Sequence, residues 1–243
     1  MKLKTRKYLS LLLILVVVIC FSISCFSKDT SRVVVSNVND TINITNIEDK
    51  LSINKVKELQ EYYENSDIVG VLSIEEMSEF NYPVTQSKDN SYYLNHDYYK
   101  KNDKYGSIYA DYRSDLDNSK KIIIYGHSSS KINVPFNILE NYENKDYYNK
   151  YKYITLETKT NTYRYEIFSV YIETNDFTYM NMNFDNKGDW YAHILGLQNK
   201  SLYSTDIVLD MDEDILILQT CSKNTSYQNH NNKYLLIVSR RVK

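Results

Sequence analysis

The sequence has 243 residues, of which 42% are hydrophobic and 25% are charged, so it can form one sizeable globular domain beside a targeting segment. A formal net charge of -2 argues against a strongly basic nucleic-acid-binding protein, and we expect no nucleic-acid partner. Only five Gly and two Pro accompany 25 Tyr, which argues against a collagenous or low-complexity chain and predicts a compact, aromatic-rich core.

The N-terminal segment, residues 1–27, has the pattern of a membrane anchor. Four Lys or Arg residues stand within the first seven positions, and an uncharged run then extends from Tyr8 through Ser27. This run is about long enough to cross a bilayer as a helix. The basic flank favours a cytoplasmic N-terminus with the rest of the chain outside, so we predict a single-pass protein of the cell membrane. A cleaved signal peptide, or a lipoprotein signal at Ser24-Cys25, is the alternative.

The segment after the anchor changes in composition twice. Residues 28–46 are rich in Ser, Asn, Thr, Asp and Val without helical periodicity, which predicts a linker. Hydrophobic residues recur at helical spacing from Ile47 to Glu64, which predicts an amphipathic helix. We assign the main folded domain to residues 47–243.

The rest of the chain is predicted to be mainly β. Short segments rich in Ile, Val, Tyr and Thr are bounded by Asn, Asp, Ser and Gly, a pattern typical of strands in a closed or nearly closed barrel. Helical insertions are predicted near Asn137–Tyr151 and Lys187–Gln198, where apolar residues return at three and four. The predicted strands are Ile68–Ile74, Tyr82–Thr85, Ser107–Tyr112, Lys121–Tyr125, Tyr153–Thr158, Thr162–Tyr171, Ile215–Thr220 and Tyr234–Val238.

Cys221 and His127 are the candidate catalytic pair. Cys221 is the only cysteine outside the apolar N-terminal run, so it lacks a partner for an intramolecular disulfide. A lone thiol outside the cell is either buried or kept for its reactivity. Cys221 and His127 each follow an apolar predicted strand, and a buried strand holds a reactive side chain in a fixed position.

A thiol with the usual pKa of about 8.5 needs a neighbouring base to become a thiolate at neutral pH, and His127 is the candidate for that base. The alternatives are a buried core cysteine and a loop histidine bonded to backbone.

The other histidines, His96, His193 and His230, lie among polar residues, and we expect them to be solvated. No second Cys and no close His stands at metal-ligand spacing around Cys221 or His127. We therefore expect neither a metal nor another cofactor.

Three motifs resemble the sortase family. The stretch Leu218-Gln-Thr-Cys221 is similar to the Thr-Leu-x-Thr-Cys signature of sortases, and Tyr125-Gly-His127 matches their histidine motif. The runs 81–97 and 105–113 look like class B sortases in particular. The motifs occur in the family's order, and the histidine precedes the cysteine, unlike in papain-like proteases. The resemblance extends from about Ile47 to the C-terminus.

The resemblance implies an eight-stranded sortase barrel and a two-step transpeptidase reaction. Cys221 would attack a backbone carbonyl in a sorting motif near the C-terminus of a secreted protein, forming an acyl-thioester. An amine of a peptidoglycan precursor would then resolve the thioester. The implied motif is of an Asn-Pro type, Asn90 and Leu94 would line its groove, and the Ser222 N–H would bind the oxyanion. A turn asparagine and a core leucine remain the alternatives for Asn90 and Leu94.

One departure from the family concerns a cation. Sortases carry an Arg on the last strand that faces the cysteine, yet no Arg occurs from Ser222 through Tyr234. One alignment puts Tyr234 at that position, and a shift by one residue puts Lys233 there. Lys233 would stabilise an oxyanion only as a point charge, and we predict reduced activity. It is alternatively a solvated residue at a strand start. The competing functions are a thiol hydrolase and a membrane-tethered module that binds sorting motifs with weak or no activity.

Overall fold

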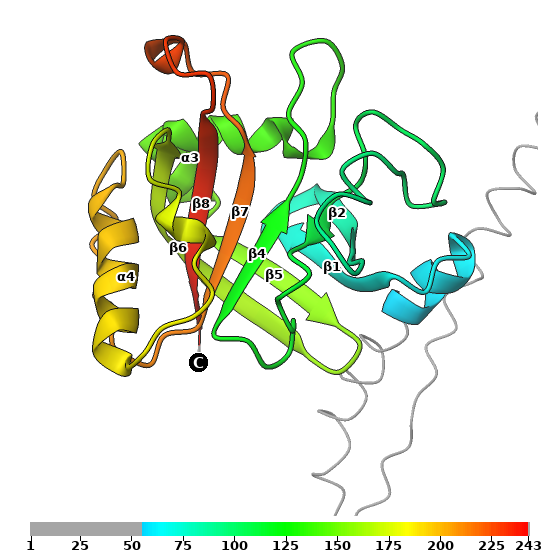
Figure 1. The fold of residues 1–243 in the computed structure, drawn as a ribbon, viewed down its shortest axis with the longest axis horizontal. Coiled ribbons are helices and arrows are strands. Elements are labelled where there is room, and N and C mark those ends of the chain that lie inside the picture. Colours follow the sequence, from blue (N-terminus) through cyan, green and yellow to red (C-terminus); the bar gives the residue numbers. More distant parts are fainter. Residues whose placement is uncertain (1–54, 243) are drawn as a thin grey trace, which may run out of the picture. The chain divides into compact units, whose positions relative to one another are not determined.

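Residues 55–242 are described by a computed structural model, in which the strands close into a mixed barrel (Figure 1). Around the barrel the order is β1-β2-β3-β4-β7-β8-β6-β5. The β2–β3 and β4–β7 pairs are parallel, and the remaining neighbours are antiparallel. The prediction of a closed eight-stranded barrel is confirmed. The strands are β1 Ile68–Ile74, β2 Met77–Thr85, β3 Tyr109–Ala110, β4 Lys121–Tyr125, β5 Tyr153–Thr158, β6 Thr162–Glu173, β7 Ile215–Cys221 and β8 Tyr234–Arg241.

The predicted strand bounds agree with β1, β4 and β5, and they differ most at β2 and β3. β2 begins at Met77, whereas the prediction began at Tyr82. The sequence did not reveal the first part of the strand because the exposed pair Ser78 and Glu79 breaks the alternation that marks a half-buried strand. β3 contains only Tyr109–Ala110, although Ser107–Tyr112 was predicted. Strand β3 is therefore a short bridge between β2 and β4.

The helices include both predicted insertions. The first is split into a 3-10 helix, η1 (Pro135–Glu143), and α3 (Lys145–Lys150), which are separated by Asn144. Asn144 caps α3 because its side chain accepts a hydrogen bond from the Asp146 N–H at 2.7 Å. The second is α4 (Lys187–Asn199). Residues 55–62 are helical and belong to the predicted N-terminal helix. Two short 3-10 helices were not predicted, η2 (Thr178–Met180) and η3 (Thr225–Tyr227).

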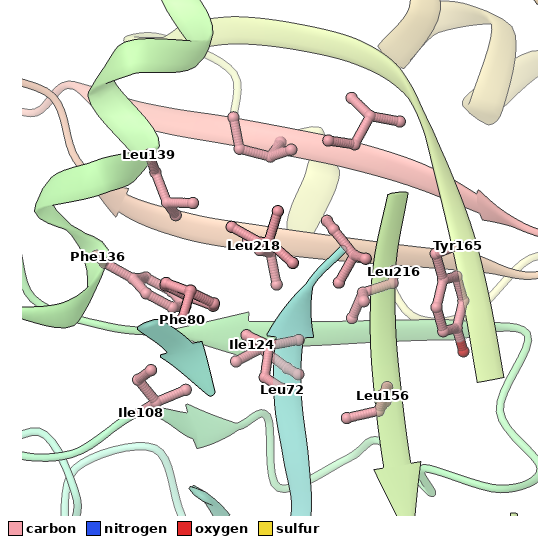
Figure 2. Close-up of a cluster of buried hydrophobic side chains, with 14 of the residues drawn as sticks. Leu72, Phe80, Ile108, Ile124, Phe136, Leu139, Leu156, Tyr165, Leu216 and Leu218 are labelled. Carbon is pink, nitrogen blue, oxygen red and sulfur yellow. The ribbon is translucent and has the colours of Figure 1, made fainter. Parts of the chain in front are cut away.

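The core fills the barrel and extends outside it. Figure 2 shows Leu72, Ile124 and Leu218 meeting from different strands, with Phe136 and Leu139 of η1 packed beside them. On the other face of β4 and β7, the helix α4 contributes Trp190, Ile194 and Leu197 to a second buried cluster. Because β4 and β7 are covered on both faces, their sequences are continuous apolar runs and do not alternate.

The predicted membrane anchor (1–27) and linker (28–46) lie outside the described residues. The same is true of the first part of the predicted N-terminal helix. Within residues 55–242, no helix has the length and apolar character needed to cross a membrane.

Candidate active site

Parallel pairing of β4 with β7 sets the positions of His127 and Cys221. The register pairs Tyr125 with Gln219, and the Gly126 N–H donates to the Gln219 carbonyl at 3.1 Å. Cys221 is the last residue of β7, two residues beyond Gln219, and His127 follows two residues after Tyr125, just past the end of β4. Both residues therefore lie at the same edge of the barrel. The structure therefore brings the predicted base and the predicted nucleophile together.

The predicted site residues divide into two groups around a cleft of about 500 Å³. Asn90, Leu94, His127 and Cys221 line this cleft together. The lining of the cleft, as far as the structure describes it, includes neither Ser222 nor Lys233. Tyr234, one of the two positions considered for the family cation, also lines the cleft. The sequence gave no cleft role to several further lining residues, most of them aromatic, which are Tyr109, Tyr125, Phe177, Tyr179, Met180, Gln219 and Asn232.

A backbone carbonyl orients His127. The Nε2 atom of His127 lies 2.8 Å from the carbonyl oxygen of Leu94. A carbonyl oxygen only accepts hydrogen bonds, so Nε2 must carry a proton in this contact. In a neutral His127 the proton acceptor is then Nδ1. Leu94 thus contributes to the site through its backbone as well as through its side chain in the cleft.

Gly106 supports this carbonyl, and sequence analysis gave it no role. Its φ of 52° lies in the left-handed region, and a Cβ atom built there would stand 2.6 Å from the Leu94 carbonyl oxygen and 2.2 Å from the Tyr93 carbonyl oxygen. Any side chain would therefore push the carbonyl that holds His127. The signal that pointed to this position was only that Gly106 lies in a run resembling class B sortases.

The surroundings of Cys221 make its thiol less acidic than a free cysteine thiol. Desolvation by the surrounding protein raises its pKa, and the negative charge of Glu140 on η1 raises the pKa further. The residue itself reaches the surface and is not in a disulfide. A thiol of raised pKa is protonated at neutral pH, so His127 must remove its proton before or during attack.

Tyr234 is the residue of β8 that lies opposite Cys221. The register pairs Cys221 with Tyr234, and the Ser222 N–H donates to the Lys233 carbonyl at 3.0 Å. Cys221 and Tyr234 are therefore the closely spaced, non-hydrogen-bonded pair of the antiparallel ladder. The Lys233 ammonium instead donates to the carbonyl of Asn224 at 2.7 Å. The catalytic role of Lys233 stays a prediction, and its side chain is engaged away from the thiol.

A buried carboxylate positions one wall of the cleft. Asp111 is fully buried and accepts hydrogen bonds from the Asn90 Nδ2 at 2.9 Å and the Tyr125 hydroxyl at 2.8 Å. Arg113 donates to the same carboxylate from Nε and Nη2, both at 2.8 Å. Desolvation favours the neutral acid, yet these hydrogen bonds outweigh it and lower the pKa of Asp111 to about 2. Asn90 is thus held by an ionised acid beneath the cleft, and its Oδ1 accepts from the Tyr112 N–H at 3.0 Å.

A cysteine that ends one strand and a histidine just past the end of its neighbour line one cleft, an arrangement typical of an enzyme with a thiol nucleophile. Residues 72–242 match the model of the sortase domain, so the chain belongs to the sortase family. Sortase B of Staphylococcus aureus is 32% identical over 180 residues, which cover 74% of this chain and 72% of that protein. A mutant form of Clostridium perfringens sortase B superposes with a TM-score of 0.72 at 28% identity, covering 82% of this chain and 92% of that one. The protein is a sortase-family cysteine transpeptidase, homologous to sortase B.

The S. aureus enzyme has also been solved as a sortase B–substrate complex, and a sortase B has been solved in complex with triglycine. Each of these structures has a TM-score of 0.66 and 28% identity to this chain. They cover 82% of this chain and 96% or 97% of the solved chains.

Replacing Gly106 by Ala should slow the reaction of Cys221, because the displaced Leu94 carbonyl no longer holds His127. A positioned general base contributes roughly 10²–10⁴-fold, so we expect a loss of at least about tenfold in kcat/KM. The measurement is kcat/KM for a sorting peptide beside the thermal unfolding midpoint. Gly196→Ala is the matched control, since a Cβ there meets nothing within 4 Å. Wild-type kcat/KM in a folded Gly106→Ala protein would refute this role.

Replacing Glu140 by Gln should lower the pKa of Cys221, because it removes a negative charge that disfavours the thiolate. The Gln oxygen can still accept the Lys223 N–H that Glu140 now accepts at 2.8 Å. We expect the rate of alkylation by iodoacetamide to rise at lower pH than in the wild type. The exposed Glu79→Gln serves as control. A profile that is unchanged or shifted to higher pH contradicts the assigned influence of Glu140.

Proposed function

We propose that this sortase is anchored in the cell membrane with its catalytic domain outside, and that it attaches secreted proteins to the cell wall. It cleaves a C-terminal sorting motif through an acyl-thioester on Cys221 and transfers the protein to a peptidoglycan amine. The main observation behind this proposal is that Cys221, at the end of β7, and His127, just past the end of the parallel neighbour β4, line one cleft. The localisation rests on the charged and apolar pattern of residues 1–27.

The reaction follows from the chemistry of the two side chains. His127 takes the thiol proton, the sulfur of Cys221 bonds to the scissile carbonyl carbon, and the peptide C–N bond breaks. The proton on His127 passes to the departing amine. In the second half, the wall amine attacks the thioester and loses a proton to His127, and the C–S bond breaks. Cys221 leaves as a thiolate that regains the proton from His127, so an amide replaces the cleaved peptide bond.

The substrate class is supported by the lining of the cleft and by the homologues. Asn90 and Leu94 stand in the cleft with four tyrosines, which offer flat apolar surfaces to an extended peptide. Homologous sortase B enzymes have been solved with a substrate and with triglycine, which supports a peptide motif and a glycine-type amine here. We propose an Asn-Pro-type motif for this chain on the strength of its class B motifs.

Oxyanion stabilisation is the weak part of the site. The Ser222 N–H proposed for this role already donates to the Lys233 carbonyl, and that bond must open or be shared with substrate. No Lys or Arg occurs among the described residues that line the cleft. The presence of Tyr234 opposite Cys221, in place of a cation, therefore favours a second candidate function. In this alternative the protein is a slow enzyme that mainly retains sorting motifs or releases them by hydrolysis.

Incubation of the full-length protein, in a mild detergent, with an Asn-Pro-type peptide should give an acyl adduct on Cys221. The thioester persists until an amine resolves it, and intact-protein mass spectrometry detects the added mass. Adding triglycine should convert the adduct to an amide product.

The controls separate the candidates. Cys221→Ala and His127→Ala should give no adduct, and a free acid in place of the amide would identify a hydrolase. Peptide binding without any adduct would rule out the acyl-enzyme mechanism in favour of a binding module.

Replacing Tyr234 by Arg should raise kcat/KM, because it places a guanidinium beside Cys221 where the oxyanion develops. Removing one oxyanion donor costs other enzymes about 10²–10³ in kcat, so a gain of about tenfold is a conservative expectation. The measurement is steady-state transpeptidation with triglycine. Lys233→Gln is the comparison, and we expect little change because its ammonium is bound to Asn224. A lower rate in Tyr234→Arg, or a large loss in Lys233→Gln, would overturn this assignment.

A further inference from the structure

A second cavity, of about 570 Å³, lies outside the catalytic cleft. It is formed by the start of β4, the loop that follows η2, and the first turn of α4, which Figure 1 shows at the same end of the barrel. We call it the basic cavity. Its lining residues are Arg113, Ser119, Lys120, Lys121, Met182, Asn183, Phe184, Asn186, Lys187 and Trp190.

All the charged side chains that line the basic cavity are cations. Lys120 and Lys187 share the exposed carboxylate of Asp212, at 3.9 and 2.6 Å. Arg113 is paired with Asp111 inside the protein. Within residues 55–242, Lys121 forms no ion pair with a carboxylate. The cluster therefore holds more positive than negative charge, which favours an anion.

Lys121 lines this cavity and is a buried residue, and burying an ammonium without a carboxylate partner is costly. Its Nζ donates to the Asn181 carbonyl at 2.7 Å and lies 2.8 Å from His193 Nε2. Desolvation and the nearby Arg113 lower the pKa of Lys121 to about 7. His193, which was predicted to be solvated, is only partly exposed, and its Nε2 lies against Lys121. Burial and Lys121 lower the pKa of His193 to about 3.

The basic cavity also has an apolar wall. The rings of Phe184 and Trp190 meet edge to face with centroids 5.0 Å apart. Lys121 Nζ lies 5.6 Å from the Phe184 ring and Lys120 Nζ lies 5.8 Å from the Trp190 ring. Cations beside aromatic faces suit a ligand that has a charged group attached to a planar or apolar body.

Two short contact chains connect the basic cavity to the catalytic cleft. Arg113 binds Asp111, which in turn holds Asn90 and Tyr125 of the cleft. Lys121 holds the carbonyl of Asn181, and the residue before it, Met180, lines the cleft. A ligand that binds Arg113 therefore affects the wall with Asn90 and Tyr125, and a ligand that binds Lys121 affects the wall with Met180.

We propose that the basic cavity binds a small organic anion, a phosphate or carboxylate on a planar apolar body, and that its occupancy changes the affinity of the cleft for peptide. The first half does not depend on the proposed function. The second half, the coupling to peptide binding, rests on it.

Binding is tested by calorimetry with phenyl phosphate on the full-length protein in detergent. We expect saturable binding that weakens about tenfold or more in the double variant Lys120→Gln, Lys187→Gln, since two of the lining charges are removed. Lys145→Gln, on α3, is the matched control and should bind as the wild type does. Equal affinity in the double variant and the control, or no saturable binding, would overturn the site. Titrations with benzoate and inorganic phosphate show which part of the ligand the cavity recognises. Tighter binding of phenyl phosphate or benzoate than of inorganic phosphate supports a role of the aromatic wall in binding, and tighter binding of inorganic phosphate contradicts it.

Coupling is tested by the dissociation constant of a sorting peptide for Cys221→Ala, with and without saturating phenyl phosphate. A severalfold change that disappears in the Lys120→Gln, Lys187→Gln background supports coupling. An unchanged peptide affinity overturns it while leaving the anion site intact. If no peptide binds at all, the proposed function fails and the calorimetric result still stands.

Discussion

The parallel pairing of β4 with β7 is the constraint on which the site depends. Every residue of β4 is buried, and β7 is buried from Ile215 to Leu218, with the barrel interior on one face and the α4 cluster on the other. A slip of one residue would turn each strand's side chains to the opposite face, so two-sided burial fixes the register. That register brings the ends of β4 and β7 to the same edge of the barrel, where His127 and Cys221 lie. The positions of the reacting pair thus depend on the hydrophobic packing of the strands that lead to them.

The electrostatics of the cleft favour a neutral resting pair. Desolvation and, to a smaller extent, Glu140 raise the pKa of Cys221, and Tyr234 stands where a cation would lower it. A preformed thiolate–imidazolium pair is therefore disfavoured, and proton removal by His127 accompanies attack. A thiol that stays protonated is also less easily oxidised, because the thiolate is the form that reacts. The same surroundings that we expect to slow acyl transfer are thus expected to protect the thiol from oxidation.

The sequence predicted the parts of the molecule that depend on local pattern. The apolar runs indicated β4 and β7, and the residues following them identified His127 and Cys221. Contacts between segments distant in sequence left no local signal, which is why the roles of Asp111 and Glu140 were missed. His193 was expected in solvent but is only partly exposed, because its polar neighbours in sequence do not reveal Lys121, which contacts it across the fold. The choice between Lys233 and Tyr234 needed strand register, since a shift of one residue exchanges them.

The strand β4 carries a costly group at one end and supports the base at the other. Lys121 begins the strand and His127 follows its end, about 20 Å away for six residues of extended chain. A buried ammonium without a carboxylate partner lowers stability, and here two hydrogen bonds offset only part of that loss. An anion beside Lys121 would favour its charged form and strengthen the bond to the Asn181 carbonyl. Because Met180 adjoins Asn181 and lines the cleft, that bond acts on the cleft wall, so the energy of one buried charge is linked to the shape of the peptide site.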